Sequence, residues 1–191
     1  MGYFWQNEKI KLRLSKKSDW IYFYESCKDS ETRFMFYTES ELPFDREVCR
    51  KKFADFLKSA KKKGRVDLTV INCEGDVVGS IDLYDVDHRA GTFQIATYIM
   101  PRHAGKGYGE AALSLMLEYC FFEMRLHKYN ARIIKENEKS IRLHEKLGAR
   151  LEGVLSDMFY HRGRYYDLLW YGLTKEEFEK QKAKEEKDKC N

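Results

Sequence analysis

Three glycines at alternate positions, Gly105, Gly107 and Gly109, stand between an extended apolar segment and a longer apolar stretch. Backbone N–H groups at the start of a helix have no partner within the helix, and the helix dipole favours an anion there. Glycines also let the backbone approach oxygens that a side chain would hold off. The loop therefore predicts a phosphate or pyrophosphate site. A tight strand-to-helix turn that binds nothing is the alternative interpretation.

Two familiar phosphate-binding motifs do not fit this loop. A dinucleotide fingerprint requires a third glycine where the chain has Glu110, and a Walker loop requires a Gly-Lys-Ser/Thr sequence that the segment lacks. Arg102, His103 and Lys106 are close enough in sequence to add positive charge to a bound anion. We therefore expect an anion-binding loop of another kind.

Hydrophobic periodicity predicts the elements that must position the loop. Alternating apolar residues predict strands, and recurrence at three and four residues predicts helices. Glu74-Gly75-Asp76 is typical of a hairpin turn, Asp45 of a helix N-cap, and Thr174 with Glu177 of a capping box. The expected strands are 9–14, 66–70, 78–83, 92–100, 128–134 and two within 149–171; the expected helices follow residues 19 and 45 and span 107–126, 137–147 and 175–191.

Two segments have a less regular pattern. Residues 33–43 are aromatic and acidic without a clear period, which favours a loop or broken helix beside a substrate pocket. Residues 175–191 mix acids and bases, which predicts a solvated helical tail after the folded part.

Composition and charge limit the class of protein. The 191 residues suffice for one globular domain, and 43% hydrophobic residues exclude a disordered chain. The net charge of +4 is modest, so a solvated helix face is favoured over a nucleic-acid surface for the basic cluster. This cluster comprises Lys51, Lys52, Lys58, Lys61, Lys62, Lys63 and Arg65.

Cysteine usage and hydropathy indicate the compartment. The five cysteines are scattered and include no C-x-x-C pair, as expected for reduced thiols. Glu8 and Lys9 stand where a signal peptide would need an apolar stretch, and Glu118 interrupts the most apolar segment of the chain. We expect a cytoplasmic protein that does not enter a membrane.

Two ordered segments together resemble the signatures of the GNAT superfamily of N-acetyltransferases. They are Tyr98-Ile-Met-Pro-Arg-His-Ala-Gly-Lys-Gly-Tyr-Gly-Glu-Ala-Ala and Asn137-Glu-Lys-Ser-Ile-Arg-Leu-His-Glu-Lys-Leu-Gly-Ala. The likeness runs from about Lys9 to Leu173 and is nearest to the spermidine and ribosomal-protein N-terminal acetyltransferases. It implies an α+β domain over 1–174 with a mostly antiparallel, splayed sheet flanked by helices, followed by the tail at 175–191.

The resemblance also implies a cosubstrate, acetyl-CoA, and its binding residues, with no metal. The pantetheine arm would lie along Thr97, Tyr98 and Ile99, where a backbone N–H would reach the thioester carbonyl. Asn137 and Ser140 would lie beside the pantetheine at the start of the following helix. The diphosphate would be held by Ala104, Gly105, Lys106, Gly107, Tyr108, Gly109 and Glu110.

One position departs from the family pattern. The family usually has a tyrosine, thought to protonate the departing thiolate, where this chain has His144. His144 shares a helix face with Ile141 and Leu147, so we expect it to point inward. A catalytic acid and a buried, hydrogen-bonded histidine are both consistent with that position. The loop begins with Ala104, where the family usually has Arg or Gln.

The acceptor is expected to be a primary amine, either of a small polyamine-like molecule or of a protein N-terminus. The acidic and aromatic stretch with Glu39, Glu41, Phe44 and Asp45 would suit a polycation. Glu39, Glu41, Asp85 and Asp87 are unranked candidates for the base, and Tyr160 and Asp167 are either pocket residues or ordinary sheet residues.

Other functions remain open at this point. A CoA-binding regulatory or interaction module without catalysis is the main alternative, and a nucleic-acid binder is a weaker one. An exposed strand edge near the closing hairpin would permit a homodimer.

Overall fold

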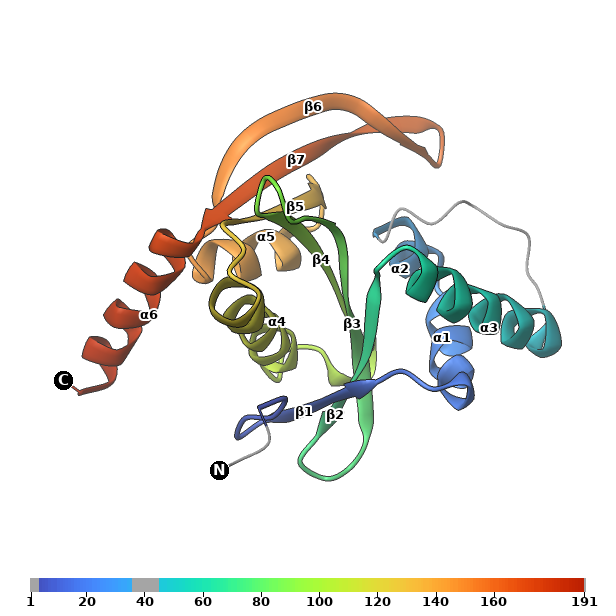
Figure 1. Cartoon of the computed structure of the whole chain (residues 1–191). Helices are drawn as coiled ribbons and strands as arrows, with labels where there is room; N and C mark the ends of the chain where they lie inside the picture. Colours follow the sequence, from blue (N-terminus) through green and yellow to red (C-terminus); the bar gives the residue numbers. More distant parts are fainter. Residues whose placement is uncertain (1–3, 36–44, 191) are drawn as a thin grey trace. The chain divides into compact units, whose positions relative to one another are not determined.

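The computed structural model describes residues 4–35 and 45–190, with side chains up to residue 188. Figure 1 shows the elements along the chain. The strands are β1 (Ile10–Leu14), β2 (Val66–Asn72), β3 (Val77–Asp87), β4 (Thr92–Ile99), β5 (Lys128–Ile134), β6 (Arg150–His161) and β7 (Arg164–Thr174). The helices are η1 (Lys17–Asp19), α1 (Trp20–Cys27), α2 (Ser30–Met35), α3 (Arg46–Lys62), η2 (Pro101–His103), α4 (Tyr108–Glu118), η3 (Tyr119–Glu123), α5 (Glu138–Lys146) and α6 (Lys175–Cys190).

The chain divides into two compact units. Unit 1 consists of the described residues of Met1–Tyr84 and Ala96–Leu115, and unit 2 of those of Asp85–Ile95 and Met116–Asn191. The strands form a seven-stranded mixed sheet in the order β1-β2-β3-β4-β5-β7-β6. Strand β4 contributes its first half to unit 2 and its second half to unit 1. No helix of the described residues has the length and apolarity to span a membrane.

In unit 1, three antiparallel strands and two packed helices enclose an apolar core. Strand β1 pairs with β2 along its whole length, and the Leu12–Val70 pair is completely buried. Helix α3 packs on α1, where the rings of Phe23 and Phe53 lie 5.5 Å apart. The N-cap of α3 is Asp45, whose Oδ1 accepts a hydrogen bond from the Val48 amide, as the sequence predicts.

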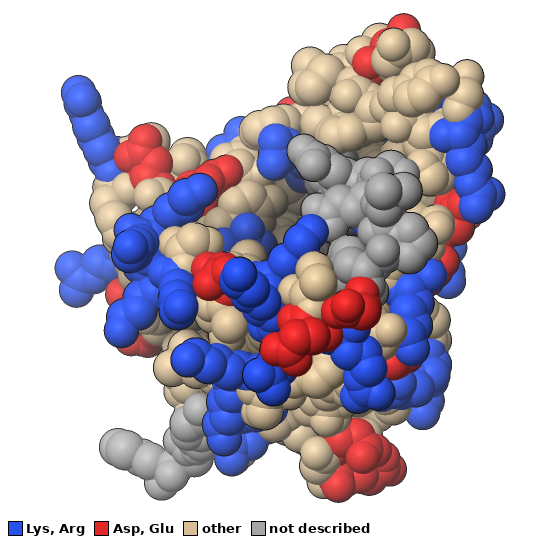
Figure 2. All heavy atoms as spheres, turned by 90° about the vertical axis from the view of Figure 1, so that its right-hand side faces the viewer, with Lys and Arg blue, Asp and Glu red and all other residues tan. Residues whose placement is uncertain are grey.

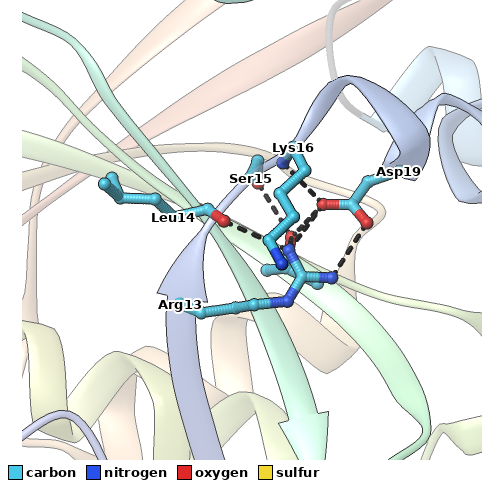
Figure 3. Close-up of polar contacts among 6 residues, drawn as sticks. Arg13, Leu14, Ser15, Lys16 and Asp19 are labelled. Carbon is cyan, nitrogen blue, oxygen red and sulfur yellow. Dashed lines mark hydrogen bonds and ion pairs between the residues drawn. The ribbon is translucent and has the colours of Figure 1, made fainter.

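A partly buried ion pair stabilises the beginning of unit 1. The guanidinium of Arg13 donates to both carboxylate oxygens of Asp19, at 2.7 and 2.9 Å (Figure 3). Asp19 also accepts from the Lys16 amide and the Thr69 hydroxyl. These hydrogen bonds connect the turn after β1 to strand β2, because Thr69 belongs to β2.

Unit 2 has parallel and antiparallel pairing. Strand β4 pairs with β5 in parallel over three residue pairs, from Thr92–Lys128 to Gln94–Asn130, although both strands continue. Strand β5 pairs antiparallel with β7 along its whole length, and β7 pairs with β6 in a long hairpin (Figure 1). The short β4–β5 register agrees with the splayed sheet that the family resemblance implies.

Aromatic rings form the core of unit 2. Phe93 lies 5.3 Å from Phe121 and 5.6 Å from Tyr129 between ring centroids. Phe178 of α6 packs on Phe121 at 5.5 Å and is 1% exposed. The expectation of a solvated tail is therefore wrong for the first turns of α6, which Phe178 anchors to the core.

Most expected elements are confirmed, and two others differ. The helix expected over 107–126 is regular only to Glu118, after which a π-helical turn, η3, leads into β5. Residues 33–35 of the expected loop or broken helix belong to α2, and residues 36–43 of it lie outside the described part.

Candidate functional site

The glycine loop lies between η2 and α4 in unit 1, where the sequence places it. Gly105 and Gly107 have φ of 78° and 79°, a left-handed conformation that favours glycine. The first intrahelical bond runs from the Ala111 amide to the Gly107 carbonyl. Among the described residues, the amides of 105–109 donate to no protein acceptor. Consecutive free donors at a helix N-terminus are what an anionic phosphate group requires.

The residues before the loop hold it against β3. The Met100 amide donates to the Val78 carbonyl at 2.9 Å, and the Ala104 amide donates to the Pro101 carbonyl at 3.1 Å. A β-carbon on Gly79 would approach the Tyr98 carbonyl oxygen closer than any real contact, so Gly79 allows β4 to lie against β3. The loop is thus fixed at both ends by backbone contacts.

Lys9 is a basic residue that sequence reasoning did not assign to the loop. Its Nζ lies 2.9 Å from the position of a β-carbon on Gly107. The same N-terminal segment also binds α4, because the Asn7 side-chain amide donates to the Ala111 carbonyl at 3.3 Å. No local pattern connects residue 9 to residue 107, so only the fold brings this charge to the loop.

Two polar atoms around the expected CoA segment are buried without a partner among the described residues. They are Thr97 Oγ1 on β4 and His103 Nδ1 on η2. A buried hydroxyl or ring nitrogen without a hydrogen bond is costly, so each implies a further polar partner. Thr97 lies in the stretch for which the resemblance implies pantetheine contacts, and His103 directly precedes the loop. These observations fit a bound polar ligand such as CoA.

Tyr98 follows Thr97 on β4, and a hollow lies beside η2. Burial raises the pKa of the Tyr98 phenol to about 12, so this phenol is protonated at neutral pH. A hollow of about 290 Å³ lies beside Arg102 and His103 and is also lined by Tyr22 and Asp76. It borders the loop from the η2 side.

Two of the basic side chains of α3 pair with acids of the same helix. Lys58 lies 3.6 Å from Asp55, and Arg50 lies 3.3 Å from Glu47, each within one helical turn. Figure 2 shows Lys and Arg side chains interspersed with Asp and Glu on the face it presents. Arg65, the last residue of the basic cluster, forms an ion pair with Asp82 of β3 at 2.6 Å.

In unit 2, Asn137 and Ser140 begin α5. The Asn137 side chain accepts a hydrogen bond from the Ser140 amide at 3.2 Å and therefore caps the helix. The cap explains locally why an asparagine stands at this position. Contact of either residue with a cofactor stays a prediction.

His144 is 7% exposed and points inward from α5, as predicted from its helix face. Its Nδ1 lies 2.7 Å from the Ser140 carbonyl oxygen, and its Nε2 lies 3.0 Å from the Tyr129 hydroxyl. Burial lowers the pKa of His144, although the Ser140 carbonyl acts in the opposite direction. The ring is therefore neutral at physiological pH. Its role as the acid stays a prediction.

Tyr129 is a second residue that sequence reasoning missed. It belongs to β5, is 1% exposed, and its ring stacks on His144 with centroids 5.9 Å apart. A tyrosine on the inward side of a buried strand needs a hydrogen-bond partner for its hydroxyl. That requirement is the signal by which the sequence could have identified Tyr129. The hydroxyl also lies 3.3 Å from the Ile95 carbonyl oxygen, which is a second acceptor within reach of its single proton.

The acidic candidates differ in their surroundings. Asp85 has φ of 49° on β3 and accepts a hydrogen bond from Gln94. Asp87 accepts hydrogen bonds from the amides of Arg89 and Ala90, which lower its pKa and identify it as a turn residue. Glu39, Glu41 and Phe44 lie outside the described residues.

The closing hairpin holds the last two candidates. Asp167 accepts from Lys135 Nζ at 2.9 Å and from the Asp157 amide, where β6 bulges. Tyr160 is 66% exposed and packs its ring on Tyr165. The contacts of Asp167 favour a structural role.

Comparison with known proteins identifies the family. The family model described as an acetyltransferase (GNAT) domain matches residues 9–150. An uncharacterised N-acetyltransferase derived from the SPbeta prophage of Bacillus subtilis is 30% identical over 176 residues, 92% of this chain and 96% of that protein. The spermidine N(1)-acetyltransferase of Escherichia coli K12 is 37% identical over 102 residues, 52% of this chain and 54% of that enzyme.

The fold agrees with solved structures. The spermidine N-acetyltransferase of Vibrio cholerae in complex with CoA and spermine matches with a TM-score of 0.80 at 20% identity, over 90% of this chain and 99% of that chain. At this identity the likeness establishes the fold. The family match includes the glycine loop and the α5 motif. The chain therefore belongs to the GNAT family of acetyltransferases and is an N-acetyltransferase.

Proposed function

We propose that this N-acetyltransferase transfers the acetyl group of acetyl-CoA directly to a terminal amine of a small polyamine-like molecule. The observation that carries the cosubstrate is the row of free amides at 105–109 at the N-terminus of α4, where Gly105 and Gly107 are in the left-handed conformation. The unpartnered Thr97 hydroxyl and His103 ring nitrogen support a ligand along the same segment.

The proposed roles follow from the chemistry of each group. In unit 1, Ala104 to Glu110 bind the diphosphate through the backbone, and Lys9 and Lys106 add positive charge. Thr97, Tyr98 and Ile99 bind the pantetheine arm, and a backbone amide of this stretch stabilises the developing oxyanion. The thioester supplies the acetyl group.

The proposed base and the proposed residues of α5 belong to unit 2. Asp85 accepts the proton of the attacking amine, directly or through water, and Asn137, Ser140 and His144 of α5 are the further proposed residues of this unit. A lysine-like amine has a pKa near 10.4, so it must lose a proton before it attacks.

A polyamine is the acceptor that the relatives favour. Three of the similar proteins are named spermidine acetyltransferases, and one structure contains spermine. A protein N-terminus is the second candidate, because another relative is named for ribosomal acetylation. An α-amine has a pKa near 7.7 to 8.0 and needs less help from a base.

Two assays test the proposal. Calorimetry with CoA and acetyl-CoA measures binding, and a thiol reagent measures release of CoA with spermidine, small monoamines or Ser-terminated peptides. We expect binding of both nucleotides and turnover fastest with spermidine. Fastest turnover with the peptides would contradict the polyamine assignment, and absence of CoA binding would contradict the enzymatic role.

The alternative is a CoA-binding module without catalysis, which the neutral His144 at the position of the usual tyrosine favours. Such a module binds CoA and releases no thiol with any amine. The same two assays therefore separate the two functions.

Compartment and assembly complete the proposal. Cys49 and Cys120 are buried free thiols, which supports a reducing cytoplasm. Strand β6 lies at the end of the sheet order and exposes apolar side chains. These are Leu151, Val154, Leu155, Met158 and Tyr160. A homodimer through this edge stays a prediction.

A further inference from the structure

The hydrogen bonds of His144 determine which of its nitrogens carries the proton. A carbonyl oxygen only accepts, so the 2.7 Å contact with the Ser140 carbonyl places a hydrogen on Nδ1. In the neutral ring Nε2 is then an acceptor, and the Tyr129 hydroxyl at 3.0 Å donates to it. The nitrogen of His144 that faces Tyr129 has no proton to give. The transferable proton of this pair is on the tyrosine.

The Tyr129 hydroxyl lies where strands β4 and β5 separate. Tyr129 is paired with Phe93, one residue before the last pair, Gln94–Asn130. Its hydroxyl reaches the carbonyl of Ile95, the first residue of β4 after the paired segment. In the proposed function the pantetheine arm follows Thr97, Tyr98 and Ile99, which come directly after this part of β4 in the chain. The Tyr129 phenol thus lies where β4 and β5 begin to separate. Its partner His144 stands at the position of α5 where the family usually has a tyrosine.

We propose that Tyr129 is the proton donor to the departing sulfur, and that His144 is a positioning residue that holds the Tyr129 hydroxyl. The inference rests on the proposed acetyl transfer. It accounts for the histidine at position 144, since a tyrosine on β5 needs an acceptor there, whereas a tyrosine on α5 would supply the phenol itself.

The proton balance of the step is simple. The amine nitrogen forms a bond to the carbonyl carbon, the carbon–sulfur bond breaks with its electron pair staying on sulfur, and the Tyr129 O–H proton moves to that sulfur. The acylated nitrogen gives up its extra proton to the base or to water, and the phenolate recovers one proton from the same pool. Net transfer is one proton from the amine to the thiol, with no oxidant or reductant.

The charged residues next to His144 and Tyr129 in the sequence have partners of their own. The pKa of His144 is set by burial and by the Ser140 carbonyl, with no charged side chain contributing. The next acid on α5, Glu145, is engaged with the Tyr171 hydroxyl, and Lys128 beside Tyr129 pairs with Glu152.

Tyr171 provides a matched control. It lies on β7, is 3% exposed, and donates to Glu145 of α5 at 3.0 Å, so Tyr171→Phe also removes a buried phenol bound to that helix. We expect Tyr129→Phe to lower kcat with spermidine by about 10²- to 10⁴-fold, with KM for acetyl-CoA within about twofold. Tyr171→Phe is expected to keep kcat within about threefold.

Two further measurements exclude a purely structural effect. Fluorinated tyrosine at position 129, which lowers the pKa of the phenol, should move the alkaline limb of the kcat profile to lower pH, whereas the same replacement at position 171 should not. In ¹⁵N spectra without substrate, His144 should show a protonated Nδ1, and its Nε2 signal should shift in Tyr129→Phe but not in Tyr171→Phe. His144→Ala should lower kcat, and its alkaline limb should still follow fluorination of Tyr129.

The outcomes are distinguishable. If wild-type protein turns over and Tyr129→Phe retains more than half of kcat with an unmoved pH profile, the inference is wrong and the proposed function stands. If the wild type releases no thiol, both fail. A protonated Nε2 on His144 would overturn the inference independently of activity. Loss of activity in Tyr129→Phe with lost CoA binding or a collapsed melting transition would assign Tyr129 a structural role instead.

Discussion

The carboxylate of Asp85 accepts a 3.0 Å hydrogen bond from the side-chain amide of Gln94, although the Asp85 backbone has φ of 49°. A non-glycine residue in this region stores strain of about 1 kcal/mol, less for Asp than for most residues. Strain of this kind persists where the surrounding structure holds it and is frequent at functional sites. This combination is why we propose Asp85 as the base.

We expect Asp85→Asn to separate activity from stability. Asparagine tolerates the left-handed conformation and keeps a side-chain acceptor for Gln94, so stability should change by less than about 0.5 kcal/mol. An amide cannot accept the amine proton, so kcat/KM for spermidine should fall by about 10²-fold or more. Steady-state kinetics and a urea titration measure both. Asp87→Asn, in the adjacent turn, is the control and should remain active.

Substitution of a loop glycine should weaken CoA binding. Gly105→Ala places a β-carbon at a φ of 78° where no protein atom lies within 4 Å, so it meets the ligand rather than the protein. We expect the Kd for CoA to rise about tenfold or more by calorimetry.

Gly64→Ala is the matched control for backbone strain. Gly64 ends α3 with φ of 69°, and the position that a β-carbon would take there likewise has no atom within 4 Å. Both variants should lose about 1 kcal/mol of stability. Equal CoA affinity of the two variants would show that the loop does not hold the diphosphate.

The elements of this fold were predictable where one local signal decides them. Asp45 caps α3 and Thr174 forms its capping box with Glu177, because both motifs act within four residues. The glycine loop and the inward direction of His144 follow from local spacing in the same way. Phe178 of α6 did not follow, because a single apolar residue in a charged helix has no periodicity.

The missing parts of the site depend on contacts that are distant in sequence. Lys9 approaches Gly107 across almost a hundred residues, and Tyr129 reaches His144 from a different element. Register between β5 and its neighbours decides which face Tyr129 takes, and a slip of one residue would turn it away from α5. Local patterns therefore predict the glycine loop, whereas the places of Lys9 and Tyr129 follow only from tertiary contacts.

The Arg13–Asp19 pair should contribute to stability in a pH-dependent way. Burial acts to raise the pKa of Asp19, but hydrogen bonds from Arg13, Lys16 and Thr69 outweigh it and hold the pKa below its ordinary value. The contribution is therefore present above about pH 4 and is lost as the pH falls through the lowered pKa. Asp19→Asn should cost about 2 kcal/mol at pH 7 and progressively less in acid.

Urea titrations from pH 7 to pH 2.5 measure this dependence. Glu47→Gln, which removes an exposed pair with Arg50, is the control and should change stability by less than about 0.5 kcal/mol. A constant cost of Asp19→Asn across the range would refute the electrostatic interpretation.

The pKa of a second carboxylate, Asp67, is shifted in the opposite direction. Asp67 on β2 lies directly opposite Asp82 on β3, and Arg65 binds Asp82 through Nε and a terminal nitrogen. Burial, followed by the charge and hydrogen bond of Asp82, raises the pKa of Asp67 to about 8. Asp67 is therefore protonated in the native protein at neutral pH and donates a hydrogen bond to Asp82.

Because the native state holds this proton more tightly than the unfolded chain, stability should fall as the pH rises from about 4 towards 8. Asp67→Asn keeps a donor towards Asp82 without the titration. The variant should match the wild type near pH 4.5 and exceed it by on the order of 2 kcal/mol at pH 8 in urea titrations. Asp55→Asn, exposed on α3, should show no such divergence. Parallel stability curves for Asp67→Asn and wild type would mean that Asp67 is ionised in the folded protein.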